Sequence, residues 1–183
     1  MSEQDKRGGR RIHGPATLPG LLCAALAFLA DQGFKLVMFR IVDFDAWPLP
    51  RIRLAPFFDI VLAWNRGVSY GWFTQQSDAG RWLLTAVALA VSAALLWWLA
   101  RQRRAVPAAA IGMIIGGALA NALDRVIHGA VADFFWFHVG AFSWYVFNIA
   151  DVAIVAGVIL LLYDSFTHDG RDAADTPRNG SAP

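Results

Sequence analysis

Four ionisable side chains lie in or beside apolar segments of the C-terminal half of the chain: Asp124, Arg125, Asp133 and Asp151. A charge at the centre of a spanning helix costs about 2.5–3.5 kcal/mol on insertion scales, so such residues usually face a partner, a water-filled cavity or a reaction site. Asp133 and Asp151 are separated by a turn and are both expected near the same membrane face. The fold can therefore bring them together.

Two carboxylates in a site of low dielectric constant cannot both ionise cheaply, so one of the pair is expected to keep a proton. The ionised member can then act as general base on a water molecule while the protonated member polarises a carbonyl group. This is the chemistry of amide hydrolysis without a covalent intermediate. A serine or cysteine nucleophile has no support, because no histidine is placed by a local motif near any serine, and Cys23 lies inside an apolar run.

The composition predicts a membrane protein. Hydrophobic residues make up 57% of the 183 residues, charged residues 16%, and the mean hydropathy is +0.44. Basic residues cluster near the N-terminus and at Arg101, Arg103 and Arg104, where they flank apolar runs as cytoplasmic loops do. Nucleic-acid binding is therefore a poor interpretation of these charges. The histidines show no metal-ligand spacing, and neither a metal nor a cofactor is expected.

Apolar runs predict an all-α membrane protein with four transmembrane helices and a small extracytoplasmic sheet between the first two. The helices are expected over about 18–42, 82–100, 106–127 and 144–163. The segments 1–17 and 164–183 are polar and are expected to be disordered cytoplasmic tails. Prolines exclude a spanning helix from 43–80, where aromatic residues alternate with polar or small ones around Gly67 and Gly71. That alternation predicts a short twisted sheet or hairpin on the membrane surface.

Polar residues at helical spacing form three sets. Asp31 and Lys35 are four apart, which favours an ion pair that either fastens the first helix or orients a catalytic group. In the third helix, Gly112, Gly116, Ala120 and Asp124 share one face that allows close packing, and Asn121 and Arg125 share another. Asn148 and Asp151 share a face in the expected fourth helix. The polar groups of the last two helices therefore gather near the outer membrane face.

These features leave three functions open. A small transporter or channel would use the acids and Arg125 as a proton or ion path, with charges spread through the bilayer. A scaffold subunit would explain the small-residue face but gives Asp133 and Asp151 no use. A peptidase best fits polar residues crowded toward one face.

Five short motifs in order then resemble a known family. They are DQGFK (31–35), NRGVSYG (65–71), GGALANALDR (116–125), VADF (131–134) and FNIAD (147–151). Together they are similar to the bacterial lipoprotein signal peptidases, also called signal peptidase II. The resemblance implies a multi-pass protein of the bacterial inner membrane, with its active site near the periplasmic face. Its substrates would be prolipoproteins whose cysteine carries a diacylglyceryl group, cut just before that cysteine.

The resemblance also implies roles for residues. Asp133 and Asp151 would be the catalytic aspartates. Substrate-binding or site-supporting roles fall to nine others: Asp31, Lys35, Asn65, Gly67, Gly116, Asn121, Asp124, Arg125 and Asn148. Membrane lipids are expected partners, and a monomer is expected. Two departures, Ala120 where the family often has glycine and Tyr70 where phenylalanine is commoner, bear on fine geometry only.

Overall fold

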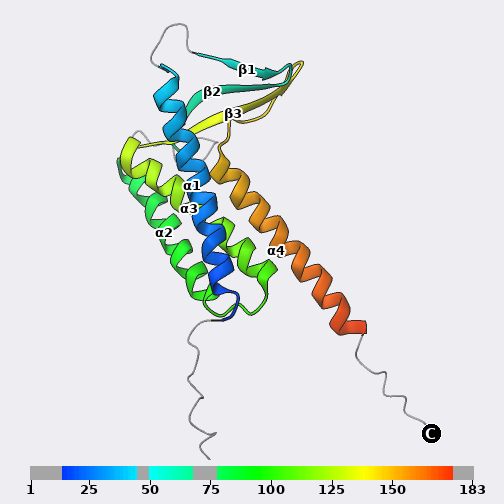
Figure 1. The fold of residues 1–183 in the computed structure, drawn as a ribbon. Helices are drawn as coiled ribbons and strands as arrows, with labels where there is room; N and C mark the ends of the chain where they lie inside the picture. Colours follow the sequence, from blue (N-terminus) through cyan, green and yellow to red (C-terminus); the bar gives the residue numbers. More distant parts are fainter. Residues whose placement is uncertain (1–13, 45–49, 68–77, 175–183) are drawn as a thin grey trace, which may run out of the picture.

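The computed structural model describes residues 14–44, 50–67 and 78–174, and over these ranges it shows four long helices with a small sheet at one end (Figure 1). The helices are α1 (Thr17–Ile41), α2 (Asp78–Leu99), α3 (Ala105–His128) and α4 (Ile149–Ala174). All four contain a stretch long and apolar enough to cross a bilayer. The predicted fold class is therefore confirmed.

Helix α3 is the central helix, because it packs against the other three. In its most apolar stretch 61% of the residues are buried, against 17–22% in the other helices. Glycines allow this close approach: a Cβ atom added at Gly112 would lie 2.0 Å from the backbone oxygen of Gly20 in α1, and one at Gly116 would lie 2.2 Å from that of Ala24. The small-residue face predicted for this helix is thus the contact between α1 and α3.

The α2–α3 loop lies at the end of the bundle away from the sheet (Figure 1). It carries the basic cluster at 101–104, and the start of α1 is bound to it by a hydrogen bond from the Gly14 N–H to the Ala100 carbonyl, 2.8 Å long. Arg104 also forms an ion pair with Asp164 of α4. The basic loop and the sheet are therefore at opposite ends of the bundle, so that a cytoplasmic loop would place the sheet outside.

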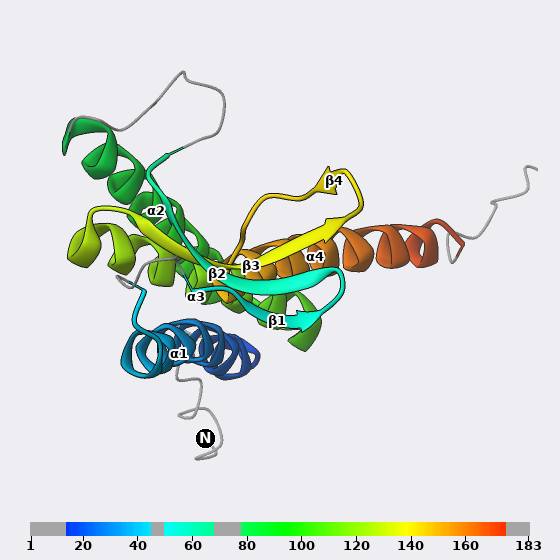
Figure 2. The same ribbon diagram turned by 90° about the horizontal axis from the view of Figure 1, so that it is seen from above.

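The sheet has four antiparallel strands in the order β1 (Ile52–Ala55), β2 (Phe58–Asn65), β3 (Val131–Val139) and β4 (Phe142–Ser143). Figure 2 shows it from above, with β3 and β4 over the start of α4 and β1 on the side of α1. Its two longest strands, β2 and β3, come from distant parts of the sequence. The site is built where they meet the bundle.

Three expectations need correction. The aromatic segment between the last two helices was expected to be a link, but residues 131–139 form the longest strand. Helix α4 was expected from about 144, but it begins at Ile149, because Asn148 caps it, and it continues to Ala174 instead of ending near 163. The strand content expected around Gly67 to Trp72 lies largely outside the described residues, as do 1–13 of the expected N-terminal tail.

The register of β2 on β3 decides which side chains face the bundle. Asp133 pairs with Ala63 and Val131 with Asn65, after an irregularity between Ile60 and Ala63. Because side chains alternate between the two faces of a strand, Asp133 and Asn65 lie on one face, and Phe134 lies on the other. Phe134 is fully buried in an aromatic core at the end of α1, where its ring contacts Phe39.

Candidate active site

Asp133 lies on β3 at the point where the strand passes over the bundle, and its side chain is only 2% exposed. One carboxylate oxygen, Oδ1, accepts a hydrogen bond of 2.6 Å from Asn148 Nδ2, and the side chain of Asn65 also donates to this carboxylate. Burial and the nearby charge of Asp151 raise the pKa of Asp133 to about 7, against the opposing effect of these hydrogen bonds. Asp133 can therefore hold a proton near neutral pH.

Asp151 lies in the first turn of α4, where it takes part in the helix cap. The Asn148 Oδ1 accepts a hydrogen bond of 2.8 Å from the backbone N–H of Asp151, and the Asp151 Oδ2 accepts one of 3.2 Å from the N–H of Asn148. This reciprocal pair is a capping box, with asparagine and aspartate in the positions usually held by Ser/Thr and Glu/Gln. The motif FNIAD thus starts the helix and fixes the Asp151 carboxylate in one step.

Asn121 of α3 completes the connection between the two acids. Its Nδ2 donates to Asp151 Oδ1 at 2.9 Å, and its Oδ1 accepts from Asn148 Nδ2 at 3.0 Å. The Asn148 amide therefore has one hydrogen for Asp133 and one for Asn121. Asn148 therefore binds both carboxylates, and Asn121 binds Asp151 and the Asn148 side chain. Asp133, Asp151, Asn121 and Asn148 are named below the catalytic cluster, after the role that we propose for the two acids.

Two further predicted residues border this cluster. Arg125, one turn after Asn121, donates from Nη1 to the Asn121 backbone oxygen at 3.1 Å, and its positive charge acts on Asp133 and Asp151. Its Nε is buried and has no hydrogen-bond partner among the described residues. Asn65 accepts a bond of 3.2 Å from the Gly67 N–H, an Asx turn at the end of β2. Gly67 therefore orients the asparagine that binds Asp133.

Asp31, Lys35 and Asp124 form a second group between α1 and α3, named here the lysine cluster. Lys35 Nζ lies 2.6 Å from Asp31 Oδ2 and 2.6 Å from Asp124 Oδ2, and all three side chains are at most 4% exposed. Asp124 Oδ2 also accepts the backbone N–H of Ala132, and Asp31 Oδ1 accepts that of Ala150. The predicted ion pair of Asp31 and Lys35 is thus a three-residue cluster in contact with both segments that carry the catalytic cluster.

Sequence reasoning missed two groups of residues. Gln32, which lies inside the DQGFK motif, bonds to both acids of the lysine cluster. On the outer part of the sheet, Asp59 is fully buried and receives hydrogen bonds from Arg51 and from His138 Nε2, the latter at 2.8 Å. The Arg51 guanidinium also lies 4.7 Å from the centre of the Trp136 ring. Arg51, Asp59 and His138 are named the sheet cluster; Arg51 directly precedes β1, Asp59 lies in β2 and His138 lies in β3, and no motif in the sequence indicated their contact.

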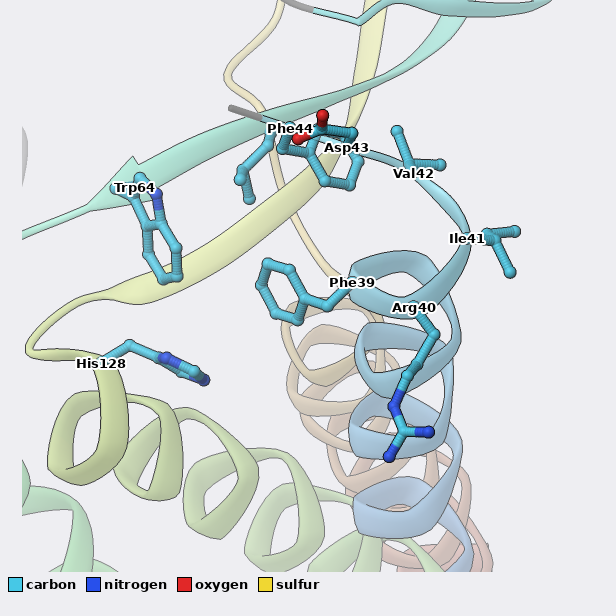
Figure 3. Close-up of a pocket in the computed structure, with 9 residues that line it drawn as sticks. Phe39, Arg40, Ile41, Val42, Asp43, Phe44, Trp64 and His128 are labelled. Atoms are coloured by element: carbon cyan, nitrogen blue, oxygen red, sulfur yellow. The ribbon is translucent and has the colours of Figure 1, made fainter. Parts of the chain in front are cut away.

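A cavity of about 580 Å³ lies at the end of α1 (Figure 3), and no residue of the catalytic cluster lines it. The rings of Phe39 and Trp64 are stacked in its wall at 5.9 Å, with His128 of α3 beside them. Trp64 pairs with Ala132, so its side chain lies on the face of the sheet opposite Asp133. Phe134 contacts the rings of Phe39 and Phe44, which line this cavity. Among the described residues, no group of three His, Cys, Asp or Glu side chains is placed to hold a metal ion.

Comparison with known proteins gives the family. The model of the family described as signal peptidase (SPase) II matches residues 23–167, which is most of the chain. The chain belongs to the signal peptidase II family. It is therefore an aspartic peptidase, and the transporter and scaffold alternatives are wrong.

Relatives named lipoprotein signal peptidase are similar over nearly the whole length. The protein of Beijerinckia indica subsp. indica is 51% identical over 155 residues, which is 85% of this chain and 91% of the relative. That of Methylobacterium radiotolerans is 49% identical over 168 residues, which is 90% of this chain and 95% of the relative. The signal peptidase II resemblance predicted from five short motifs is thus confirmed.

A solved structure supports the fold. A bacterial membrane enzyme determined by the in meso method at 2.3 Å resolution has a TM-score of 0.69 to this chain at 23% identity, covering 90% of this chain and 93% of its own. At that identity the likeness concerns the fold alone. Four membrane-spanning helices and membership of the signal peptidase II family make this chain a bacterial multi-pass membrane protein.

Proposed function

We propose that the chain removes the signal peptide from diacylglyceryl-modified prolipoproteins, and that Asp133 and Asp151 activate the water that cuts the bond before the lipidated cysteine. The family and the relatives named lipoprotein signal peptidase support the substrate class. One observation supports the dyad: both carboxylates accept hydrogen bonds from Asn148 at the cap of α4, Asp133 from its side-chain amide and Asp151 from its backbone N–H. Asn121 of α3 binds both Asp151 and the Asn148 side chain. Acids held in this way have a fixed geometry before substrate arrives.

The division of roles follows from the environment of each acid. Asp133 has its pKa raised to about 7, so it is the member that carries the shared proton near neutral pH. Asp151 has its carboxylate oxygens on N–H donors from Asn121 and from the Asn148 backbone, and we assign it the role of general base.

In the proposed reaction, Asp151 accepts a proton from water as the water oxygen attacks the scissile carbonyl carbon, and Asp133 donates its proton to the carbonyl oxygen. The resulting neutral diol then collapses: the C–N bond breaks, a proton passes from Asp151 to the leaving nitrogen, and a hydroxyl proton returns to Asp133. Each acid ends in its starting state. The Arg125 cation, which faces both acids, stabilises negative charge in the site during these steps.

The placement of the site fits a substrate that lies in the membrane. The catalytic cluster lies at the sheet end of the bundle, at the first turn of α4, and the basic loop lies at the other end. We infer that the basic end is cytoplasmic and that the site is near the periplasmic face of the inner membrane. The two acyl chains of the substrate would then stay in lipid while the peptide bond next to the modified cysteine reaches the acids. The enzyme is proposed to act as a monomer.

The test is cleavage of a lipid-modified precursor peptide by the purified protein, with the unmodified peptide as a second substrate. Asp133→Asn and Asp151→Asn should each reduce turnover by about a thousandfold or more, as expected for members of a unit that acts together. The matched control is Asp59→Asn, because Asp59 is also a buried acid near the sheet but binds no residue of the catalytic cluster. Near-normal turnover by either dyad variant, or equal cleavage of both peptides, would contradict the proposal.

A further inference from the structure

We propose that Gln32 is a positioning residue for the dyad: its side-chain amide joins the two carboxylates that hold the backbone directly before each catalytic aspartate. This inference rests on the proposed function of Asp133 and Asp151. Gln32 touches neither of these acids, so it acts through the lysine cluster.

Gln32 bridges the two acids of that cluster. Its Nε2 donates to Asp124 Oδ1 at 2.8 Å and lies 3.2 Å from Asp31 Oδ2, with the backbone oxygen of Ala120 at 3.3 Å. The side chain is half-buried between α1 and α3. Lys35 joins the same two acids through their Oδ2 atoms. The amide and the ammonium group therefore form two parallel connections between Asp31 and Asp124.

Each of these acids also holds one catalytic segment. Asp124 Oδ2 accepts the N–H of Ala132 at 3.1 Å, one residue before Asp133, and Asp31 Oδ1 accepts the N–H of Ala150 at 3.0 Å, one residue before Asp151. The lysine cluster therefore fixes β3 and the first turn of α4 relative to each other. A shift of either acid moves one aspartate of the dyad away from the other.

The charges explain why an amide is needed at this position. Two carboxylates and one ammonium group leave the lysine cluster with one excess negative charge, in a place almost without water. This excess charge is stabilised by neutral N–H donors: the amide of Gln32 and the backbone N–H groups of Ala132 and Ala150. Without the amide, Asp124 Oδ1 loses a donor in apolar surroundings. The carboxylate then gains by turning toward another donor, and this change weakens its hold on Ala132.

The decisive variant is Gln32→Met, which keeps the length of the side chain and removes the amide. It should lower kcat on the lipid-modified precursor by about tenfold to a hundredfold, the effect expected of a misplaced catalytic group, with KM changed by less than about twofold. The matched control is Leu36→Met, one turn later on the same helix, where the side chain is 57% exposed at the lipid-facing surface. It should leave both constants unchanged. A role in packing alone would be satisfied by methionine, so a wild-type kcat for Gln32→Met overturns the inference.

A second measurement does not depend on catalysis. Hydrogen–deuterium exchange of the full-length protein in detergent should become faster at the amides of Ala132 and Ala150 in Gln32→Met and unchanged in Leu36→Met. If Gln32→Met does not fold, Gln32→Asn takes its place, since it keeps the amide but shortens its reach. Unchanged exchange at both amides in the variant that folds overturns the inference.

The two proposals fail in different ways. A wild-type protein that does not cleave the lipid-modified precursor contradicts the proposed function, whatever Gln32 does to the exchange of Ala132 and Ala150. A wild-type protein that cleaves it, together with a Gln32→Met variant of equal kcat, contradicts only the role of Gln32.

Discussion

The lysine cluster and the sheet cluster contain the same kinds of side chain in different surroundings. In the lysine cluster both the cation and its two acids are buried within the bundle, between 1% and 4% exposed. In the sheet cluster Asp59 is buried, but the side chain of its partner Arg51 is 41% exposed. The charges of the lysine cluster are therefore stabilised by protein groups alone, whereas water reaches Arg51 and screens its attraction to Asp59. The acids are similarly buried in the two clusters, so the exposure of the cation is what distinguishes them.

Lys35→Met should show the largest effect on stability. It leaves two buried carboxylates without their cation, and breaking a buried ion pair in this way costs about 3–5 kcal/mol. We expect a large fall in the unfolding midpoint of the detergent-solubilised protein, and loss of cleavage as well. Adding Asp31→Asn and Asp124→Asn to the same variant should recover part of the midpoint, since it removes the unpaired charges. A wild-type midpoint for Lys35→Met would show that water reaches this cluster.

Gly116→Ala tests whether the lysine cluster depends on the contact of α1 with α3. The added Cβ would lie 2.2 Å from the Ala24 backbone oxygen, so the two helices must move apart, at a cost of about 1–3 kcal/mol. The control is Gly33→Ala on α1, where an added Cβ has nothing within 4 Å. It should leave the midpoint unchanged or raise it, because alanine favours the helix. Equal midpoints for the two variants would contradict the close contact.

Asp133 stands between the two regions, because it belongs to the sheet but faces the bundle. Its pKa of about 7 lies above the unfolded value, so the folded protein binds this proton more tightly, and stability falls as pH rises toward 7. Asp133→Asn should therefore be inactive and yet, above about pH 7, unfold at a higher temperature than the wild type. Wild-type kcat/KM should fall about tenfold per pH unit on the alkaline side. An Asp133→Asn protein less stable than wild type at pH 8 would contradict this.

Asp59→Asn should show the smallest effect. Burial opposes ionisation here, but hydrogen bonds from His138 and Arg51 outweigh it and hold the pKa of Asp59 below its ordinary value. This stabilisation is present above the unfolded pKa and is lost as pH falls through the lower folded pKa. The midpoint of Asp59→Asn should thus fall slightly at neutral pH, by less than that of Lys35→Met, and approach wild type below about pH 4. Turnover of the precursor should be unchanged at neutral pH.

Much of this architecture could be predicted from the sequence, because it depends on local patterns. Spanning helices follow from uninterrupted apolar runs, and the close face of α3 follows from glycines four residues apart. The strand β3 was missed because its side chains do not alternate in polarity: Phe134 fills the aromatic core on one face while Phe135 stacks on Phe58 on the other. A strand that is buried on both faces has apolar residues at successive positions. The alternation of polar and apolar residues that predicts a strand is therefore absent.

The start of α4 could have been found. Asn148 followed three residues later by Asp151 is the spacing of a capping box, which places the first helical residue at 149 and excludes a start at Trp144. The bonds of Gln32 and the sheet cluster could not have been found this way. Gln32 and Asp124 are 92 positions apart, Asp59 and His138 are 79 apart, and only the packing of α1 on α3 and of β2 on β3 brings these pairs together.

The proposed site depends on the register in which β3 pairs with β2. If β3 slid along β2 by a single residue, the phenylalanine at 134 would take the place of the acid, and the acid would enter an aromatic core that cannot solvate it. No partly active arrangement lies between these two states. Newly inserted molecules should therefore divide into fully competent and fully inert populations.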